Sequence, residues 1–262
     1  MARVSVRAQA PLSAYVLHRY DWSESSLILD VFSREQGRIA VAAKGAKRPY
    51  SQLRSVLLPF QRIHLSLGRP PKADDIGATT SEVQTLRGAE WASGAAMLTG
   101  AALFSGFYLN ELLMKLLARQ DPHPRLFDAY AATLPSLVST DETGVQAALR
   151  AFEFTLLQQT GLLPDLSMLT LTQQPVLPEA LYSLLPEAGV GAPRTGESAV
   201  PGSVLIGLQA ALEHGSVPAL QQTCALALPA LRAQLRALLH YHLGSNLLRT
   251  RQVMMGVQSL TG

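Results

Sequence analysis

A short stretch of the chain combines closely spaced cations with residues that break regular structure. Lys44, Lys47 and Arg48 lie around Gly45 and are followed by Pro49. Gly relaxes the backbone and Pro ends a strand or a helix, so the pattern predicts a short basic loop at the surface. Point charges on such a loop suit a polyanion whose backbone matters more than its sequence. A solvated loop that keeps the protein soluble is the alternative, and this stretch alone leaves both open.

Residue patterns typical of enzymes are missing from the sequence. It holds no phosphate-binding Gly-rich loop with Lys and Ser or Thr, no dinucleotide fingerprint and no Gly-x-Ser-x-Gly turn. His240 and His242 are two residues apart, so on a helix they cannot bind one metal together, and Asp74 and Asp75 read as solvated surface. The single cysteine, Cys224, excludes an internal disulfide and a cysteine zinc site. We therefore expect no catalytic residues, no metal and no cofactor.

Charge is divided unevenly along the chain. The 262 residues are 48% hydrophobic and 16% charged, which is typical of a globular protein. Residues 1–72 hold 12 Lys and Arg against 4 Asp and Glu, a net charge of +8, whereas residues 73–262 have a net charge of −5. This asymmetry predicts an anion-binding N-terminal module joined to a different kind of domain.

The first third of the chain has the period of two that half-buried strands require. In the stretch that leads into the basic loop, Ile39, Val41 and Ala43 alternate with Arg38 and small residues. Similar patterns predict strands at residues 12–18, 26–33, 37–43, 60–67 and 76–83. Five short strands within about eighty residues suit a small closed barrel.

From residue 89 onward, apolar residues recur every three and four positions, which is typical of helices. We expect helices over residues 109–117, 126–137, 143–161, 218–243, interrupted at Pro229, and 248–258. Residues 92–109 carry no charge, but they are rich in small residues and predict a buried core helix rather than a membrane span. Residues 162–202 are rich in Pro and Gly and hold either a short hairpin at 181–190 or a mobile segment. The expected fold is α+β, a barrel followed by an all-helical domain.

Cations and aromatic rings are interleaved in the N-terminal module. The rings are Tyr15, Tyr20, Trp22, Phe32, Tyr50 and Phe60. Single-stranded nucleic acid binding uses this mixture, because cations follow the phosphates while rings stack on bases. We expect most of these rings to be core residues and only Trp22 and Tyr50 to be exposed.

A second basic feature lies near the C-terminus. Arg232, Arg236 and His240 are spaced by four and form one stripe on a helix, and no acidic residue follows Glu213. The stripe could contact DNA or an acidic peptide, or it could be a solvated helix face.

Several motifs together carry a family resemblance. They lie at residues 17–27, 30–38, 43–48, 58–60, 108–113, 149–157, 161–166, 243–246 and 248–251. In this order, and over nearly the whole chain, they resemble the bacterial recombination mediator family RecO. Some members carry a four-cysteine zinc site after the Gly-Leu-Leu-Pro-Asp-Leu motif, but residues 167–202 hold no cysteine here.

The resemblance implies an oligonucleotide-binding (OB) barrel at residues 1–84 and a helical domain at residues 85–262 with an irregular insertion at about 162–202. It implies binding of single- and double-stranded DNA and annealing of complementary strands, without covalent chemistry. Implied protein partners are the acidic C-terminal tail of single-stranded DNA-binding protein (SSB), RecR and, indirectly, the RecA recombinase. A protein-interaction scaffold without DNA annealing is the alternative. With no apolar signal segment near Arg3 and Arg7, we expect a cytoplasmic, nucleoid-associated protein without membrane contact.

Two sets of residues are the expected sites. The expected DNA contacts are Arg34, Arg38, Lys44, Lys47, Arg48 and Arg54. The SSB tail ends in an apolar residue by implication of the family, so a groove with apolar walls and a cationic rim would suit it. The candidates for that rim are Lys115, Arg119, Arg150, Arg232 and Arg236.

Overall fold

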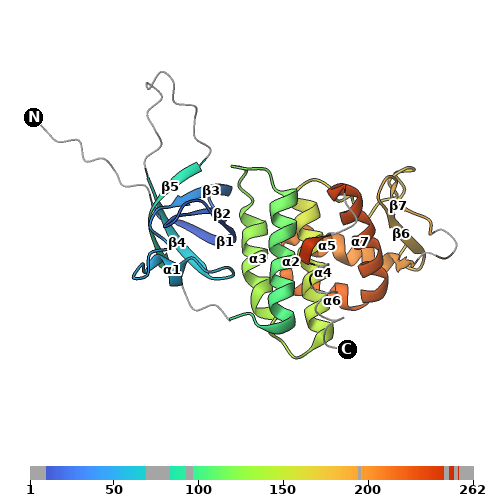
Figure 1. Cartoon of the computed structure of the whole chain (residues 1–262). Coiled ribbons are helices and arrows are strands. Elements are labelled where there is room, and N and C mark those ends of the chain that lie inside the picture. Colours follow the sequence, from blue (N-terminus) through green and yellow to red (C-terminus); the bar gives the residue numbers. More distant parts are fainter. Residues whose placement is uncertain are drawn as a thin grey trace, which may run out of the picture. The chain divides into compact units, whose positions relative to one another are not determined.

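The computed structural model describes most of the chain, and its contacts divide it into two compact units (Figure 1). The described residues are 10–68, 83–92, 97–193, 196, 198–244, 248–250 and 253. One unit comprises Met1–Met97 and Leu117–Pro124, and the other comprises Leu98–Leu116 and Arg125–Gly262.

The first unit is a closed five-stranded barrel (Figure 1). Its strands are β1 (Leu12–Asp21), β2 (Leu27–Ser33), β3 (Gly37–Ala43), β4 (Arg62–Leu67) and β5 (Val83–Trp91), with a short helix α1 (Leu53–Val56) before β4. The strand order is β1-β2-β3-β5-β4, and all neighbours are antiparallel except β3 and β5. This arrangement confirms the predicted OB barrel.

The last strand lies later in the chain than the sequence pattern suggests. The expected strand at 76–83 falls outside the described residues except for Val83, and the expected domain division at 84 and 85 falls inside β5. Residues 83–85 pair with β3, whereas residues 86–91 pair with β4. The strand is long because it must bridge both neighbours to close the barrel.

The barrel interior follows the expected alternation. Leu29 and Val31 of β2 face Ile39 and Val41 of β3 in a fully buried apolar cluster. The residues between them on β2, such as Asp30, must therefore point to the outer face of the barrel. Asp30 is nevertheless only 1% exposed, so something covers it there.

The covering segment is Leu117–Pro124, which we call the strap. The backbone N–H of Gln120 donates to the carbonyl of Arg38 at 2.9 Å. Gly37 has a φ of +68°, and a Cβ at this position would lie 1.9 Å from the carbonyl oxygen of Asp121. The start of β3 thus accepts the strap only because it carries glycine.

The second unit is a bundle of helices around α4 (Glu142–Gln159), which contacts α5, α6 and α7. The other helices are α2 (Gly100–Leu116), α3 (Pro124–Ser136), α5 (Gly202–His214), α6 (Val217–Ala225) and α7 (Leu228–Leu243). Phe152 and Phe154 of α4 are buried, and the Tyr130 hydroxyl donates to Asn110 Oδ1 at 2.6 Å inside the core. The predicted helical domain is confirmed.

Three details differ from the expected helices. The charge-free stretch 92–109 is not one helix, because β5 ends at Trp91 and α2 begins at Gly100. Helix α5 was not delimited by the sequence pattern, and most of the expected helix at 248–258 lies outside the described residues. Among the described residues, no helix is both long and apolar enough to cross a bilayer.

The insertion at 162–202 holds a small sheet. Strands β6 (Leu181–Leu185), β7 (Gly189–Gly191) and β8 (Val200–Pro201) are ordered β7-β6-β8, which confirms the predicted hairpin. Gln234 of α7 joins two parts of it, accepting from the N–H of Leu184 at 3.1 Å and donating to the carbonyl of Ser198 at 2.5 Å. A buried amide and apolar packing stabilise a segment that contains no cysteine.

Gly37→Ala is expected to destabilise the protein by about 2–4 kcal/mol, because it combines a positive φ with overlap against the strap backbone. Gly45→Ala is the matched control, since φ is +73° there but a Cβ would have only ordinary contacts. The control should cost about 1 kcal/mol in urea unfolding. Equal losses for the two variants would show that the strap does not approach Gly37 closely.

Candidate functional site

One end of the barrel presents the basic loop. Leu27 pairs with Ala43 at this end, so the β1–β2 turn and the loop after β3 lie side by side. The backbone N–H of Lys47 donates to the carbonyl of Ser25 at 3.0 Å, and that of Gly45 donates to Ser26 Oγ at 3.4 Å. These contacts fix the loop that carries the predicted cations.

A pocket of about 380 Å³ at this end gathers cations from three segments. Arg19 comes from β1, Lys47 from the loop and Arg54 from α1. Arg19 was not among the predicted contacts, because the register breaks between Val16 and His18 and a bulge changes which side the following residues face. Strict alternation in a sequence cannot reveal such a bulge.

The cations at this end differ in whether they already contact other groups of the protein. Lys47 Nζ lies 3.0 Å from Asp21 Oδ1 and donates to the carbonyl of Ser23 at 3.2 Å. The Asp21 side chain is 81% exposed, so this is a weak surface pair that a phosphate can displace. Lys44, Arg48 and Arg54 are exposed, and within the described part of the chain no carboxylate pairs with them. We call Arg19, Lys44, Lys47, Arg48 and Arg54 the basic end.

Exposed aromatic rings accompany these charges. Tyr50, at the end of the basic loop, is 99% exposed, and Trp22, on the adjacent turn, is 56% exposed. Both were predicted to be exposed, and Tyr20 joins them, whereas Tyr15, Phe32 and Phe60 are core residues as expected. Rings beside cations can stack on unpaired bases.

The other two predicted DNA contacts lie elsewhere. Arg34 and Arg38 flank the β2–β3 link, where Ser33 pairs with Gly37, and Leu27 marks the basic end of the same strand. With a rise of about 3.3 Å per residue, the two ends of β2 are roughly 20 Å apart. The structure therefore separates the six predicted DNA contacts into a group of four and a distant pair.

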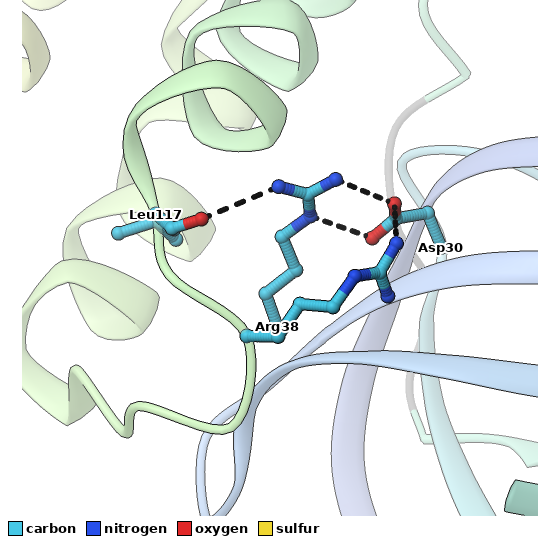
Figure 2. Close-up of polar contacts among 4 residues, drawn as sticks. Asp30, Arg38 and Leu117 are labelled. Atoms are coloured by element: carbon cyan, nitrogen blue, oxygen red, sulfur yellow. Dashed lines mark hydrogen bonds and ion pairs between the residues drawn. The ribbon is translucent and has the colours of Figure 1, made fainter. Parts of the chain in front are cut away.

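Arg38 is held by a buried carboxylate (Figure 2). Its Nε and Nη2 donate to Asp30 Oδ1 and Oδ2 at 2.9 and 2.8 Å, and its Nη1 donates to the carbonyl of Leu117 in the strap at 3.3 Å. The hydrogen bond to Asp30 raises the pKa of Arg38 above its ordinary value. Because its side chain is 15% exposed and its donors are engaged, we leave Arg38 out of the nucleic-acid interface.

Arg119, predicted for the helical groove, is a second partner of the same carboxylate. Its Nη2 lies 3.4 Å from Asp30 Oδ2, and the residue belongs to the strap in the barrel unit. Arg119 therefore belongs to a different unit from the other rim candidates.

The helical unit contains a pocket of about 210 Å³, which we call the helical pocket. Its apolar lining includes Phe104, Leu149, Leu239 and Leu248. Its basic lining residues are Arg150, Arg232, Arg236 and His240. Three of the five predicted rim cations, Arg150, Arg232 and Arg236, thus line one pocket. The latter two and His240 form the stripe on α7.

Arg150 is engaged inside this pocket. Its Nη2 lies 2.7 Å from Glu153 Oε1, which also accepts from the Tyr108 hydroxyl at 2.6 Å. Glu153 is fully buried, and burial raises its pKa despite the opposing effect of Arg150. Arg232 and Arg236 are exposed and have no ion-pair partner among the residues that the structure describes.

Lys115 supports the pocket indirectly. Its Nζ lies 3.7 Å from Oε1 of Glu111, four residues earlier on the same helix. Glu111 also accepts from the backbone N–H groups of Arg249 and Thr250 at 2.9 and 3.0 Å and from the Thr250 hydroxyl. Burial alone would raise the pKa of Glu111, but these hydrogen bonds and Lys115 outweigh it and lower the pKa. Glu111 therefore fixes the segment from which Leu248 and Thr250 line the pocket.

Metal ligands do not gather in the part of the chain that is described: no three His, Cys, Asp or Glu side chains could hold an ion there. Cys224 is buried, and burial raises the pKa of its thiol to about 12. The thiol is therefore inert as a nucleophile at neutral pH.

Comparison with known proteins identifies the family. The family model described as "Recombination protein O N terminal" matches residues 9–87, and "Recombination protein O C terminal" matches residues 97–251. The chain belongs to the RecO family. A relative named DNA repair protein RecO from Polaromonas sp. (strain JS666 / ATCC BAA-500) is 49% identical over 249 residues, covering 94% of this chain and 96% of the relative. Another of that name from Variovorax paradoxus (strain S110) is 50% identical over 257 residues, with the same coverage.

Family membership places the whole chain in DNA repair and recombination. The RecO family works in DNA repair and recombination, and DNA binding is consistent with the OB barrel and with its basic end. The matches cover both compact units, so each site lies in a part of the chain that is typical of RecO proteins.

Arg38→Met is expected to destabilise the protein by about 3 kcal/mol, because it leaves the Asp30 carboxylate buried without its main partner. Arg119→Met should cost less than about 1 kcal/mol, because the Arg119 side chain is 40% exposed and its contact is longer. Urea unfolding of both variants measures the difference. A folded Arg38→Met protein that loses DNA affinity without losing stability would contradict the structural role of Arg38.

Glu111→Gln is expected to reduce stability by about 2 kcal/mol at neutral pH, because charged hydrogen bonds to residues 249 and 250 are lost. The lowered pKa means that the carboxylate stabilises the fold above its ordinary pKa of 4.5 and ceases to do so as the pH falls through the lower, folded-state value. The difference from wild type should therefore vanish in acid. Amide exchange at Arg249 and Thr250 should also accelerate in the variant.

Glu179→Gln is the control for this experiment, since Glu179 is exposed in the same unit. If Glu111→Gln and Glu179→Gln show the same pH dependence of stability, Glu111 does not fix the 248–250 segment.

Proposed function

We propose that this protein is a recombination mediator that binds single- and double-stranded DNA and anneals complementary strands. The observation that carries the proposal is the basic end: five cations from β1, the loop and α1 gather with exposed rings on one end of an OB barrel. Family membership supports the same role.

Annealing follows from electrostatics and needs no covalent step. Two DNA strands repel each other through their phosphates, and cations that replace their counterions hold both strands close enough to pair. Lys44 and Arg48 project from a loop, so they can follow a backbone of variable shape, while Tyr50 and Trp22 can stack on unpaired bases.

We propose that the helical pocket binds the acidic C-terminal tail of SSB. The tail's terminal apolar residue would enter between Phe104, Leu149 and Leu239, and its carboxylates would meet Arg232 and Arg236 at the rim. A volume of about 210 Å³ suits one large side chain better than a nucleic-acid strand. With RecR, the protein would then help RecA to load onto SSB-coated DNA at gaps and breaks.

A protein-interaction scaffold without direct DNA contact is the competing function. Arg, Tyr and Trp are frequent at protein interfaces as well as at DNA sites, but Lys44 and Lys47 belong to a type that is depleted from the cores of protein interfaces. Competition between DNA and protein partners would distinguish the two functions.

The variant Lys44→Ala/Arg48→Ala/Arg54→Ala is expected to weaken binding of a labelled oligothymidine and of a duplex. Each lost phosphate contact reduces the slope of log affinity against log salt by about 0.7 for a single strand, so the triple variant should lose about 2 units. Fluorescence anisotropy at several salt concentrations measures both affinity and slope.

Arg34→Ala is the control, because it removes an exposed cation at the opposite end of β2 and β3. Its salt slope should match wild type. Unchanged affinity in the triple variant, or an equal loss in the Arg34 control, would argue against the basic end as the DNA site.

Arg232→Ala is expected to weaken binding of a synthetic acidic peptide with a C-terminal Phe by roughly three- to tenfold, or ~0.7–1.4 kcal/mol. Arg125→Ala, which removes an exposed cation of the same unit away from the helical pocket, should bind as wild type. Isothermal titration calorimetry gives both constants. A wild-type protein that does not bind the peptide would overturn the assignment of the pocket.

A further inference from the structure

The helical pocket contains a buried carboxylate, although its proposed ligand is acidic. Glu153 lines the pocket beside Arg150, Arg232 and Arg236. An isolated buried carboxylate would repel an incoming carboxylate strongly in a site of low dielectric. The effect of Glu153 on an acidic ligand therefore depends on how far the neighbouring arginines neutralise its charge.

The contacts of Glu153 show which cation it engages. Its Oε1 lies 2.7 Å from Arg150 Nη2, while Arg232 acts on it only through a longer-range charge interaction. The pairing is one-sided: in the described structure, Arg150 Nε and Glu153 Oε2 are buried atoms without a hydrogen-bond partner. Arg150 is 10% exposed in its side chain, so this guanidinium lies at the inner end of the pocket rather than on its rim.

We propose that Glu153 is the positioning residue that sets the charge of the helical pocket. It neutralises Arg150, so that an acidic ligand forms its ion pairs with Arg232 and Arg236 alone. This inference rests on the proposed function of the pocket and adds a rule of selectivity to it. With Arg150 neutralised, the pocket discriminates by the spacing of two rim cations four residues apart on α7 and by the apolar walls, instead of attracting any anion.

The surroundings of Glu153 make its charge adjustable. The groups that face it are Arg150 on its own helix, Tyr108 on α2, Arg232 on α7 and the Cys224 thiol on α6. Arg236 and His240 lie on the same pocket. Burial raises the pKa of Glu153, so a falling pH protonates this group while surface carboxylates are still charged. Protonation would release Arg150 and make the pocket more attractive to acidic ligands.

The test uses wild type, Glu153→Gln and the double variant Glu153→Gln/Arg150→Gln in the full chain. The probe is a synthetic peptide of four Asp residues followed by a C-terminal Phe with a free carboxylate. Glu153→Gln keeps the shape of the side chain and an acceptor oxygen for Tyr108, but it removes the negative charge that neutralises Arg150. It should therefore bind the peptide roughly three- to tenfold more tightly and with a steeper salt slope. The double variant removes both charges and should return to within about twofold of wild type.

Several results would overturn the proposal. Unchanged or weaker binding by Glu153→Gln would show that Arg150 is not withheld from the ligand. A threefold or larger loss in the double variant would show that Arg150 contacts the peptide in the wild type, and this comparison stands even if the single variant fails to fold. Absence of binding by wild type would instead overturn the proposed function of the pocket, which separates the two failures.

The pH dependence of peptide affinity is a further measurement, and a purely structural role of Glu153 would not change it. The advantage of Glu153→Gln over wild type should shrink as the pH falls, because wild-type Glu153 then takes up a proton. His240 is present in both proteins, so its own titration cancels in the comparison. An advantage that is constant across pH would contradict the role of the Glu153 charge.

Discussion

A carboxylate that is buried away from water needs a cation or several hydrogen-bond donors beside it. This requirement organises both units of the protein. Asp30, Glu111 and Glu153 are 1%, 7% and 0% exposed. Asp30 engages Arg38 and Arg119, Glu111 engages Lys115 and two backbone amides, and Glu153 engages Arg150. These three carboxylates decide which cations remain available for ligands.

Among the cations that these acids do not engage, two groups lie beside features that suit a ligand, one in each unit. In the barrel they are those of the basic end, where the nearest acid, Asp21, is itself exposed. In the helical unit they are Arg232 and Arg236, on a helix face beside apolar walls. A loop with rings suits a flexible polyanion, whereas a shaped pocket with two fixed cations suits the end of a peptide. The same residue types thus serve different ligands because the backbones that carry them differ in rigidity.

Much of the fold could be predicted from the sequence because its periods are local. Four strands of the barrel and the helices around Phe152 follow from alternation or from spacing of three and four. Trp22 and Tyr50 are exposed as expected. The length of β5, the bulge after Val16 and the return of the strap to β3 depend on distant partners. No local pattern in the sequence reveals them.

The candidate sites also combine features that a local pattern predicts with features that depend on distant partners. Lys44, Lys47 and Arg48 lie in one loop, and Arg54 lies in the short helix that follows it. Arg232 and Arg236 lie together because they share one helix. Arg38 and Arg150 carry the same side chain as these residues, and the sequence offers no sign that each faces a buried acid. Arg119 follows the end of α2 at Leu116 by three residues, yet it pairs with Asp30, 89 positions earlier in the chain. Composition identifies cations, but only the fold shows which are already neutralised.

Arginine side-chain NMR tests this account most directly. In spectra of the Nε–H groups, titration with an oligothymidine should shift Arg48 and Arg54, and titration with the acidic peptide should shift Arg232 and Arg236. Arg38 and Arg150 should keep their positions throughout, because their carboxylate partners do not release them. Shifts of Arg38 with DNA or of Arg150 with peptide as large as those of the exposed arginines would contradict the claim that buried acids determine the binding surfaces.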